Sequence, residues 1–364
     1  MKNTTNSLTK LALQKFKKNT TGVFSFWFII MCGMVAIFAY LLAPDNSRNA
    51  NQMHLEIHSK KPGFEVLMLT LPTKNEENQS FFNKLIYGKT LQKTEIPISN
   101  YTVSKNDLII DSYTENGLET ISKSYPISIF KNKSISNYIS LKKFYLGTDK
   151  YGRDLLSRML IGTRISFFIG FIAVFISLII GISIGATAGY FGGKVDAFIM
   201  WLINITWSIP TLLLVIAITL ALGKGFWQVF IAVGLTMWVE VARVVRGQIM
   251  SAKQMQYVEA AKALGFSNFR IVFNHILPNI MAPVIVISAA NFAGAILIES
   301  GLSFLGIGAQ PPTPSWGAMI KDHYSYIILG KAYLAIIPGL AIMSLVMAFM
   351  LIGNALRDAL DVKN

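Results

Sequence analysis

The chain has 364 residues, of which 53% are hydrophobic and only 14% are charged. A soluble domain usually carries about 25% charged residues, so this composition excludes an ordinary soluble domain and indicates a membrane protein. The net charge of +14 would also suit a nucleic-acid-binding protein, but in a membrane protein an excess of Lys and Arg sets the topology, and we favour that interpretation. The single cysteine, Cys32, excludes a disulfide within the chain.

Several uncharged windows are long enough, or nearly long enough, to cross a membrane, which takes about 20 apolar residues in a helix. The six windows are 23–43, 165–191, 197–222, 225–239, 276–298 and 332–356. The fourth is short, and we expect its helix to continue past Glu240 to Arg243, whose long side chain can reach the headgroups. The sequence therefore predicts an all-α polytopic membrane protein with about six transmembrane helices.

Basic residues predict the orientation of these helices. The tail at 1–22 carries five lysines and no acid, and the segment after the fourth window carries five more basic residues, namely Arg243, Arg246, Lys253, Lys262 and Arg270. Cytoplasmic loops are enriched in Lys and Arg, so we predict an N-in/C-in protein. Four basic residues argue against this, namely Lys150, Arg153, Arg158 and Arg164. They follow a long outer segment, and long loops cross the membrane largely regardless of charge.

The amino-terminal part is predicted to consist of a basic cytoplasmic tail at 1–22, mobile or lying on the anionic inner leaflet, and transmembrane helix 1 at 23–43. A lysine-rich start followed by an apolar stretch also resembles a signal peptide. However, the 21 uncharged residues at 23–43 are longer than the apolar region of a signal peptide, which has about 7–15 residues. We therefore interpret this helix as an uncleaved anchor.

The polar segment at 44–146 is predicted to be an inserted extracytoplasmic domain of partly β character between helices 1 and 2. Its enrichment in β-forming residues predicts short strands, and Pro62-Gly63, Pro72 and Asn116-Gly117 predict the turns between them. The predicted strands lie at 54–58, 64–70, 101–103 and 108–110. In the first of them, His54, Glu56 and His58 would share one face, because side chains alternate along a strand. Three such ligands could hold a transition metal, but we favour a polar strand face and predict no metal site.

The most informative segment lies between the fourth and fifth windows, at about 251–278. Its Ala-rich residues 259–264 favour a helix, and Gly265 supplies the permissive backbone that ends one. A first apolar stripe recurs at every third residue and is formed by Met255, Val258, Ala261 and Leu264. A second amphipathic stripe follows at helical spacing, formed by Phe269, Val272, Phe273 and Ile276. Pro278 marks the transition into the fifth window. The residues therefore predict a two-helix hairpin whose apolar side is covered by a partner, by the membrane or by its own helix bundle.

This hairpin resembles the EAA loop of ABC importer permeases, in its Glu259-Ala260-Ala261 start, its Gly265 and its Leu277-Pro278 end. His275 stands where Ile is usual, as in the dipeptide and oligopeptide branch. Four more segments are similar to the C-type subunits of the dipeptide/oligopeptide/nickel transport family: 146–158 (LGTDKYGRDLLSR), 189–196 (GYFGGKVD), 302–317 and 356–361. The resemblance is close over 146–362 and weak over 23–43.

The resemblance implies a five-helix ABC permease core over 147–364, in a bacterial-type inner membrane, with no catalytic site and no cofactor of its own. The implied partners are two ABC ATPase subunits that use ATP and Mg, a second homologous permease and an extracytoplasmic substrate-binding protein. The implied substrate is a di- or oligopeptide, with nickel or another small solute as alternatives. The residues that would couple to the ATPases are Glu259, Ala260, Ala261, Gly265, His275, Leu277 and Pro278. The alternative for Glu259 is a pair with Lys262 within one helix.

Polar residues in membrane spans usually face a cavity or another helix. The candidates for lining a translocation pathway are Asn204, Ser208, Asn291 and Glu299, of which Asn291 could equally bond to another helix and Glu299 could meet water near the outer end of its span. Gly181, Gly185 and Gly189 predict close helix packing, and Pro210 and Pro283 are positioned to kink helices. A self-sufficient secondary transporter would more often carry buried acids in mid-span, and a membrane-anchored scaffold would not need five further spans.

Overall fold

The computed structural model describes residues 8–72, 79–90, 94–115, 121–130, 134–223 and 225–361. The chain forms two compact units. The first contains Met1–Gly33, Ile165–Gln310 and Leu340–Asn364, and the second contains Met34–Arg164 and Pro311–Gly339. We describe each unit separately.

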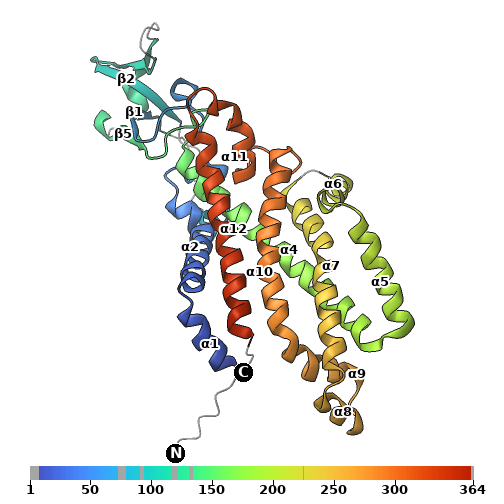
Figure 1. Ribbon diagram of the computed structural model, residues 1–364. Coiled ribbons are helices and arrows are strands. Elements are labelled where there is room, and N and C mark those ends of the chain that lie inside the picture. The colour runs from blue at the N-terminus through green and yellow to red at the C-terminus, as the bar shows by residue number, and fades with distance from the viewer. Residues whose placement is uncertain are drawn as a thin grey trace, which may run out of the picture. The chain divides into compact units, whose positions relative to one another are not determined.

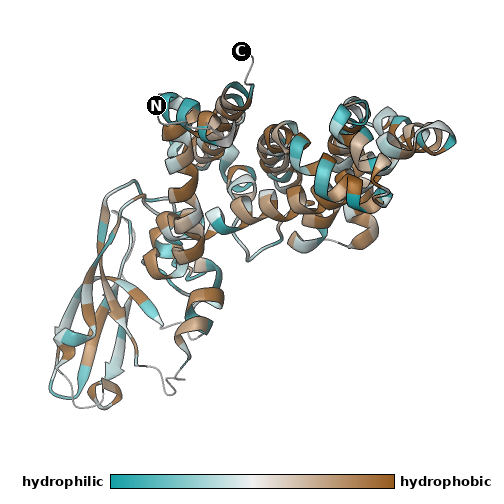
Figure 2. Ribbon diagram, turned by 90° about the horizontal axis from the view of Figure 1, so that it is seen from below, coloured by the Kyte–Doolittle hydropathy of each residue, from teal (hydrophilic) through white to brown (hydrophobic). Residues whose placement is uncertain are grey.

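Long apolar helices dominate the chain (Figures 1 and 2). Among the described residues, five helices are long and apolar enough to cross a membrane: α2 (Thr20–Leu42), α4 (Leu155–Phe191), α7 (Phe226–Ala252), a 37-residue helical run Asn268–Phe304 that ends in α10 (Leu277–Phe304), and α12 (Tyr333–Leu360). Five of the six predicted windows are therefore confirmed as long helices. The helix α4 begins ten residues before its predicted window, where the Ser157 backbone N–H donates a 2.8 Å hydrogen bond to the Asp154 carboxylate and caps the first turn.

The third predicted window, 197–222, is not one straight helix. It contains α5 (Gly193–Ser208) and α6 (Thr211–Leu222), which are bent by 92° at the break between them. Pro210 has no backbone N–H to donate, and it forces the preceding Ile209 into an extended conformation, with φ −92° and ψ 126°. The pair therefore counts as a sixth span only if both helices are taken together.

Small residues bring α4 close to α7 in the first unit. A Cβ atom placed on Gly181 would lie 2.8 Å from the carbonyl oxygen of Trp238, and one on Gly189 would lie 2.7 Å from that of Arg246. The predicted packing role of these glycines is therefore confirmed, because any larger residue would push the two helices apart. An ion pair between Arg246 of α7 and Asp196 of α5, with an N–O distance of 2.6 Å, also holds α5 to this pair.

The described part of the basic tail is helical. The helix α1 (Leu8–Lys18) ends at Asn19, whose side chain accepts a 2.9 Å hydrogen bond from the Gly22 backbone N–H and so caps the start of α2. Lys15 of α1 donates a 3.4 Å hydrogen bond to the carbonyl oxygen of Asp361, just after α12. In Figure 1, α1, α8 (Gln256–Ala263) and the last turn of α12 lie at the same end of the first unit.

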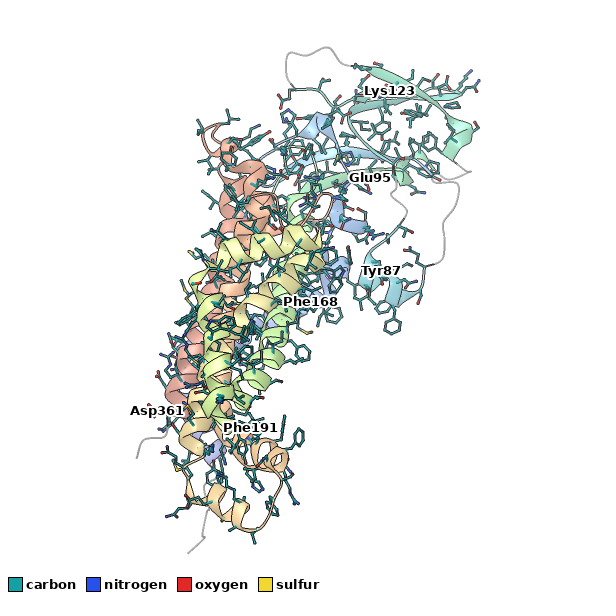
Figure 3. All side chains as sticks on the ribbon, turned by 90° about the vertical axis from the view of Figure 1, so that its right-hand side faces the viewer. Tyr87, Glu95, Lys123, Phe168, Phe191 and Asp361 are labelled. Atoms are coloured by element: carbon teal, nitrogen blue, oxygen red, sulfur yellow. The ribbon has the colours of Figure 1, made fainter. Side chains whose placement is uncertain are left out.

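The second unit contains an antiparallel five-stranded sheet in the order β4-β3-β2-β1-β5. The strands are β1 (Phe64–Thr70), β2 (Glu95–Val103), β3 (Asp107–Ser112), β4 (Ser122–Pro126) and β5 (Ile139–Phe144). Alternating residues of β3, such as Leu108 and Ile110, are fully buried against Leu69 and Phe130. Figure 3 labels Glu95 and Lys123 on this sheet, and Glu95 forms an ion pair with Lys142 at 2.6 Å.

The predicted strands at 64–70, 101–103 and 108–110 are confirmed, but the strand predicted at 54–58 is wrong. Residues Leu55–Ile57 form a 3-10 turn. A strand would place Leu55 and Ile57 on one face, whereas the turn buries Ile57 with Met68 and Phe144 and leaves Leu55 64% exposed. The turn predicted at Asn116-Gly117 lies outside the described residues.

The metal-binding hypothesis depended on that strand and has no geometric support. His54 is buried, and burial lowers the pKa of its imidazole, with a smaller lowering from the charge of Lys142. Glu56 and His58 are exposed, so the three side chains do not converge. Within the described ranges, no group of three His, Cys, Asp or Glu residues could hold a metal ion.

Candidate functional site

A helical hairpin follows α7, as the sequence predicts. The helix α8 is followed by a tight turn and by α9 (Asn268–Arg270). At the turn Gly265 has φ +76°, a conformation that side chains other than Gly adopt with strain, and the Phe266 backbone N–H donates to the carbonyl of Ala261 at 3.1 Å. This turn ends α8 and reverses the chain.

The second arm of the hairpin is continuous with α10. It runs from α9 through a π-helical segment, Ile271–Ile276, directly into α10. Pro278 lies in the first turn of α10, where a residue without a backbone N–H is tolerated. Because no loop separates the hairpin from α10, a displacement of the hairpin moves the base of α10. Short π-helical segments often occur at functional sites.

His275 holds the turn of the hairpin against its second arm. Its ring stacks on that of Phe266, with 5.5 Å between centroids and 11° between planes. The guanidinium of Arg270 also lies 4.3 Å from the centre of the Phe266 ring. The carbonyl of His275 accepts a 2.8 Å hydrogen bond from the side chain of Asn279. His275 therefore contributes to the rigidity of the hairpin.

Only part of each predicted apolar stripe is buried. Val258, Ala261, Val272 and Ile276 join a core that includes Ile249 of α7. The remaining stripe residues are exposed, namely Leu264 (72%), Phe269 (71%), Met255 (54%) and Phe273 (47%). We call these four side chains the exposed apolar set. A soluble surface seldom exposes so many large apolar groups on one short motif, which indicates a contact surface.

The hairpin also presents a free acid. Glu259 is exposed in the first turn of α8, together with Ala260. Across the described ranges its carboxylate forms no ion pair, and the alternative pair with Lys262 is not formed. Its charge is therefore available to a neighbouring molecule.

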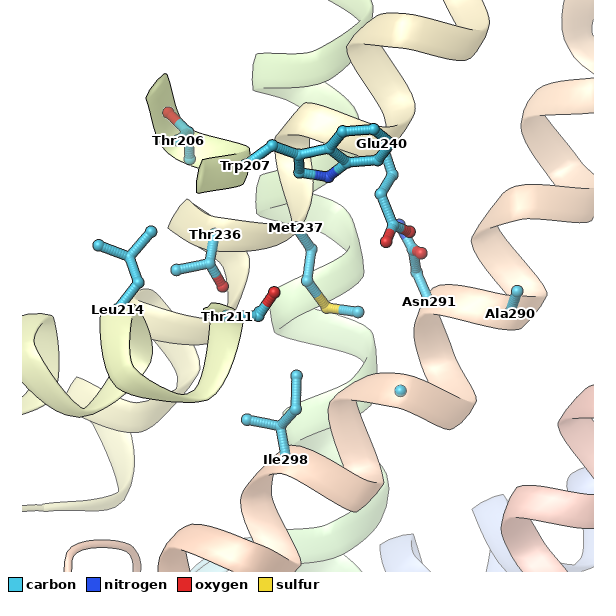
Figure 4. A pocket seen from close by; sticks show the side chains of 11 residues that line it. Thr206, Trp207, Thr211, Leu214, Thr236, Met237, Glu240, Ala290, Asn291 and Ile298 are labelled. Atoms are coloured by element: carbon cyan, nitrogen blue, oxygen red, sulfur yellow. The ribbon is translucent and has the colours of Figure 1, made fainter. Parts of the chain in front are cut away.

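A cavity of about 280 Å³ lies among α5, α6, α7 and α10 (Figure 4). Its lining residues are Thr206, Trp207, Thr211, Leu214, Thr236, Met237, Glu240, Ala290, Asn291, Gly294 and Ile298. Asn291 is only 2% exposed, and its side-chain nitrogen has no hydrogen-bond partner among the described residues. Figure 4 shows the Glu240 carboxylate and the Asn291 amide pointing toward one another. The cavity thus combines an apolar wall with a carboxylate and an unpaired amide.

Of the four residues predicted to line a pathway, only Asn291 lies at this cavity. Asn204 is exposed and accepts a 3.3 Å hydrogen bond from Arg243, and Ser208 donates to its own helix at 2.7 Å. Contact of Glu299 with water, one of the two expectations for this residue, is wrong: its side chain is 1% exposed and accepts a 2.7 Å hydrogen bond from Ser303. The sequence did not predict Glu240 as a site residue, because it follows directly after the end of the uncharged window at 225–239. In the structure α7 extends well beyond Glu240 on both sides.

Comparisons with known proteins show to which protein family the carboxyl-terminal half of the chain is similar. The family described as binding-protein-dependent transport system inner membrane component matches residues 178–363, and the N-terminal TM domain of oligopeptide transport permease C matches residues 7–62. The glutathione transport system permease protein GsiD of Pectobacterium atrosepticum is 41% identical over 219 residues, which cover 60% of this chain and 72% of that protein. The dipeptide transport system permease protein DppC of Haemophilus influenzae is 43% identical over 220 residues, 60% of this chain and 74% of that protein.

Proposed function

Because the chain belongs to the family of binding-protein-dependent transport system inner membrane components, we propose that it forms half of the translocation pathway of an ATP-binding-cassette importer for peptides. The dipeptide and glutathione permeases among its relatives support a peptide substrate over nickel or another small solute. The observation that carries the proposal is the hairpin with its exposed apolar set and its free Glu259.

The hairpin receives force from a separate ATPase subunit. The exposed apolar set would fill a groove on that subunit, and Glu259 would make polar contacts beside it, with the exposed Ala260 allowing close approach. Ala261, which we expected at this contact, packs into the chain's own core and would support α8 from behind. Gly265 sets the angle between the two arms, and His275, Leu277 and Pro278 join the second arm to α10. Asn291 of α10 lines the cavity, so closure of the ATPases would reach the pathway through a single helix.

The proposed topology is N-in/C-in. It is supported by the first unit, in which α1, the end of α12 and α8 lie at one end (Figure 1). A hairpin that contacts an ATP-hydrolysing subunit must face the cytoplasm, so both termini are assigned to the same side. Residues 1–22 are then a cytoplasmic tail, 23–43 the first span, 44–146 an extracytoplasmic domain that carries the sheet, and 147–364 the permease core.

The implied partners are two ABC ATPase subunits, which use ATP and Mg, a second homologous permease and an extracytoplasmic substrate-binding protein. The chain itself would bind no cofactor. Affinity purification of the tagged chain from its native membrane in mild detergent tests this. We expect an ATPase and a second permease to co-purify in stoichiometric amounts. Recovery of the intact chain as a homogeneous species without an ATPase would contradict the proposed function.

A further inference from the structure

Glu240 is an acid within a membrane-spanning helix, and it has no cationic partner among the residues that the structure describes. It lies near the middle of α7, and across the described ranges its carboxylate forms no ion pair and no hydrogen bond. Ionisable residues inside membrane spans are costly, and those that occur usually pair with another group or mark a substrate pathway. Since the described residues supply no partner, a function at the cavity is the better explanation.

The nearest arginine on the same helix is engaged elsewhere. Arg243 follows Glu240 by three residues, but its guanidinium lies 3.6 Å from the centre of the Trp207 ring and donates to Asn204 at 3.3 Å. Neither contact includes the Glu240 carboxylate, and among the described residues Arg243 forms no ion pair with it. Within the described part of the chain, the Glu240 carboxylate therefore has no ion-pair partner at the wall of the cavity.

The hydrogen-bonding groups of the cavity fit a ligand that carries an ammonium group next to a peptide carbonyl. The hydroxyls of Thr206 and Thr236 donate to backbone carbonyls of their own helices at 2.9 Å, which leaves their oxygens as acceptors only. The buried Asn291 amide nitrogen is an unused donor. An ammonium group has three donors and no acceptor, so it suits the carboxylate, while a neighbouring peptide carbonyl suits Asn291.

We propose that this cavity is a binding site for the free amino terminus of a peptide, with Glu240 binding the α-ammonium group and Asn291 donating to the first peptide carbonyl. The inference rests on the proposed peptide-permease function and deepens it, since it makes the permease itself selective for peptides with a free, charged amino end. The cavity volume of about 280 Å³ accommodates the end of a peptide rather than a long chain.

The charge selectivity of the cavity can be measured without transport. Cys32 is the only cysteine, so Cys32→Ser gives a background into which Thr236→Cys places a single thiol at the cavity wall. In the purified complex, or in the full-length chain in lipid vesicles, we expect a trimethylammonium-ethyl thiosulfonate to react faster than the anionic sulfonato-ethyl reagent. Glu240→Gln should lower this ratio of rates about tenfold, because it removes the charge and keeps the shape.

Competition identifies the ligand. Dialanine should slow the cationic reagent, whereas N-acetyl-dialanine, which lacks the charged amine, should not, and Glu240→Asp should retain part of the protection that Glu240→Gln loses. Glu65→Gln, the same substitution in an exposed ion pair of the sheet, is the matched control and should leave rates and protection unchanged.

Two results would overturn the inference: a ratio of rates that does not respond to Glu240→Gln, or equal protection by dialanine and its acetylated form. Either can occur in a complex that still imports peptides, so the proposed function would survive them. Conversely, a complex that lacks an ATPase but keeps the Glu240-dependent ratio and protection would overturn only the proposed function.

Discussion

Replacing Leu264 and Phe269 by aspartate is expected to dissociate the ATPase from the chain and to abolish uptake. Both side chains are more than 70% exposed on the hairpin, at 72% and 71%. Burying an apolar side chain of this size stabilises a contact by about 1.5–3 kcal/mol, so losing two and adding two desolvated charges should weaken association at least a hundredfold. The measurement is the amount of ATPase that co-purifies with the tagged chain, together with ATP-dependent peptide uptake.

Leu141 provides a matched control for this substitution. It is 63% exposed on β5, far along the chain from the hairpin, and Leu141→Asp should leave both the recovery of the ATPase and uptake unchanged. Retention of the ATPase by the double variant at the level of this control would contradict the coupling role of the exposed apolar set.

Replacing Asp149 by asparagine is expected to lower the free energy of unfolding by about 3–5 kcal/mol. Asp149 is fully buried just ahead of α4, where its carboxylate pairs with Arg153 at 2.6 Å and Arg158 at 3.6 Å and also accepts the Tyr151 backbone N–H at 2.8 Å. Without the carboxylate, two arginines remain buried without compensation. Titration of the purified chain from mild detergent into SDS measures the change.

Asp322→Asn is the control for this second prediction. Asp322 pairs with Lys150 at 3.1 Å, but its side chain is 33% exposed, and such partly solvated pairs contribute only about 0–1 kcal/mol. If Asp149→Asn unfolded at the same SDS fraction as Asp322→Asn, the buried cluster would not stabilise the fold in the way its geometry indicates.

Elements defined by local pattern could be predicted from the sequence. The strands β1 and β3 follow from short runs of β-forming residues, and the hairpin follows from two apolar stripes on either side of Gly265. Each of these patterns reports the burial of one face of one element, which neighbouring residues alone can encode.

Elements fixed by distant partners could not be predicted. The turn at Leu55–Ile57 is held by hydrogen bonds from the His54 N–H to the Tyr151 carbonyl and from the Ser59 N–H to the Asp149 carbonyl, about ninety residues later in the chain. The bend between α5 and α6 had a local signal in Pro210, but a uniformly apolar window does not say whether its helix kinks or reverses.

The candidate site was predicted only in part. The coupling residues follow one motif in sequence order, whereas the cavity draws its lining from α5, α6, α7 and α10, and no spacing along the chain brings these together. Asn204, Ser208 and Glu299 are polar residues in apolar helices like Asn291, but only the packing of the helices determines which of the four faces the cavity.

The central claim is that ATP-driven force enters the chain through the hairpin on its cytoplasmic face. A photo-crosslinker attached through Leu264→Cys in the Cys32→Ser background tests it in inside-out membrane vesicles that contain the whole complex. The account predicts a cross-link to the ATP-binding subunit whose yield changes when ATP and vanadate trap the closed ATPase. A thiol at position 264 that an impermeant reagent modifies only from the extracytoplasmic side, or a cross-linker that never captures the ATPase, would contradict it.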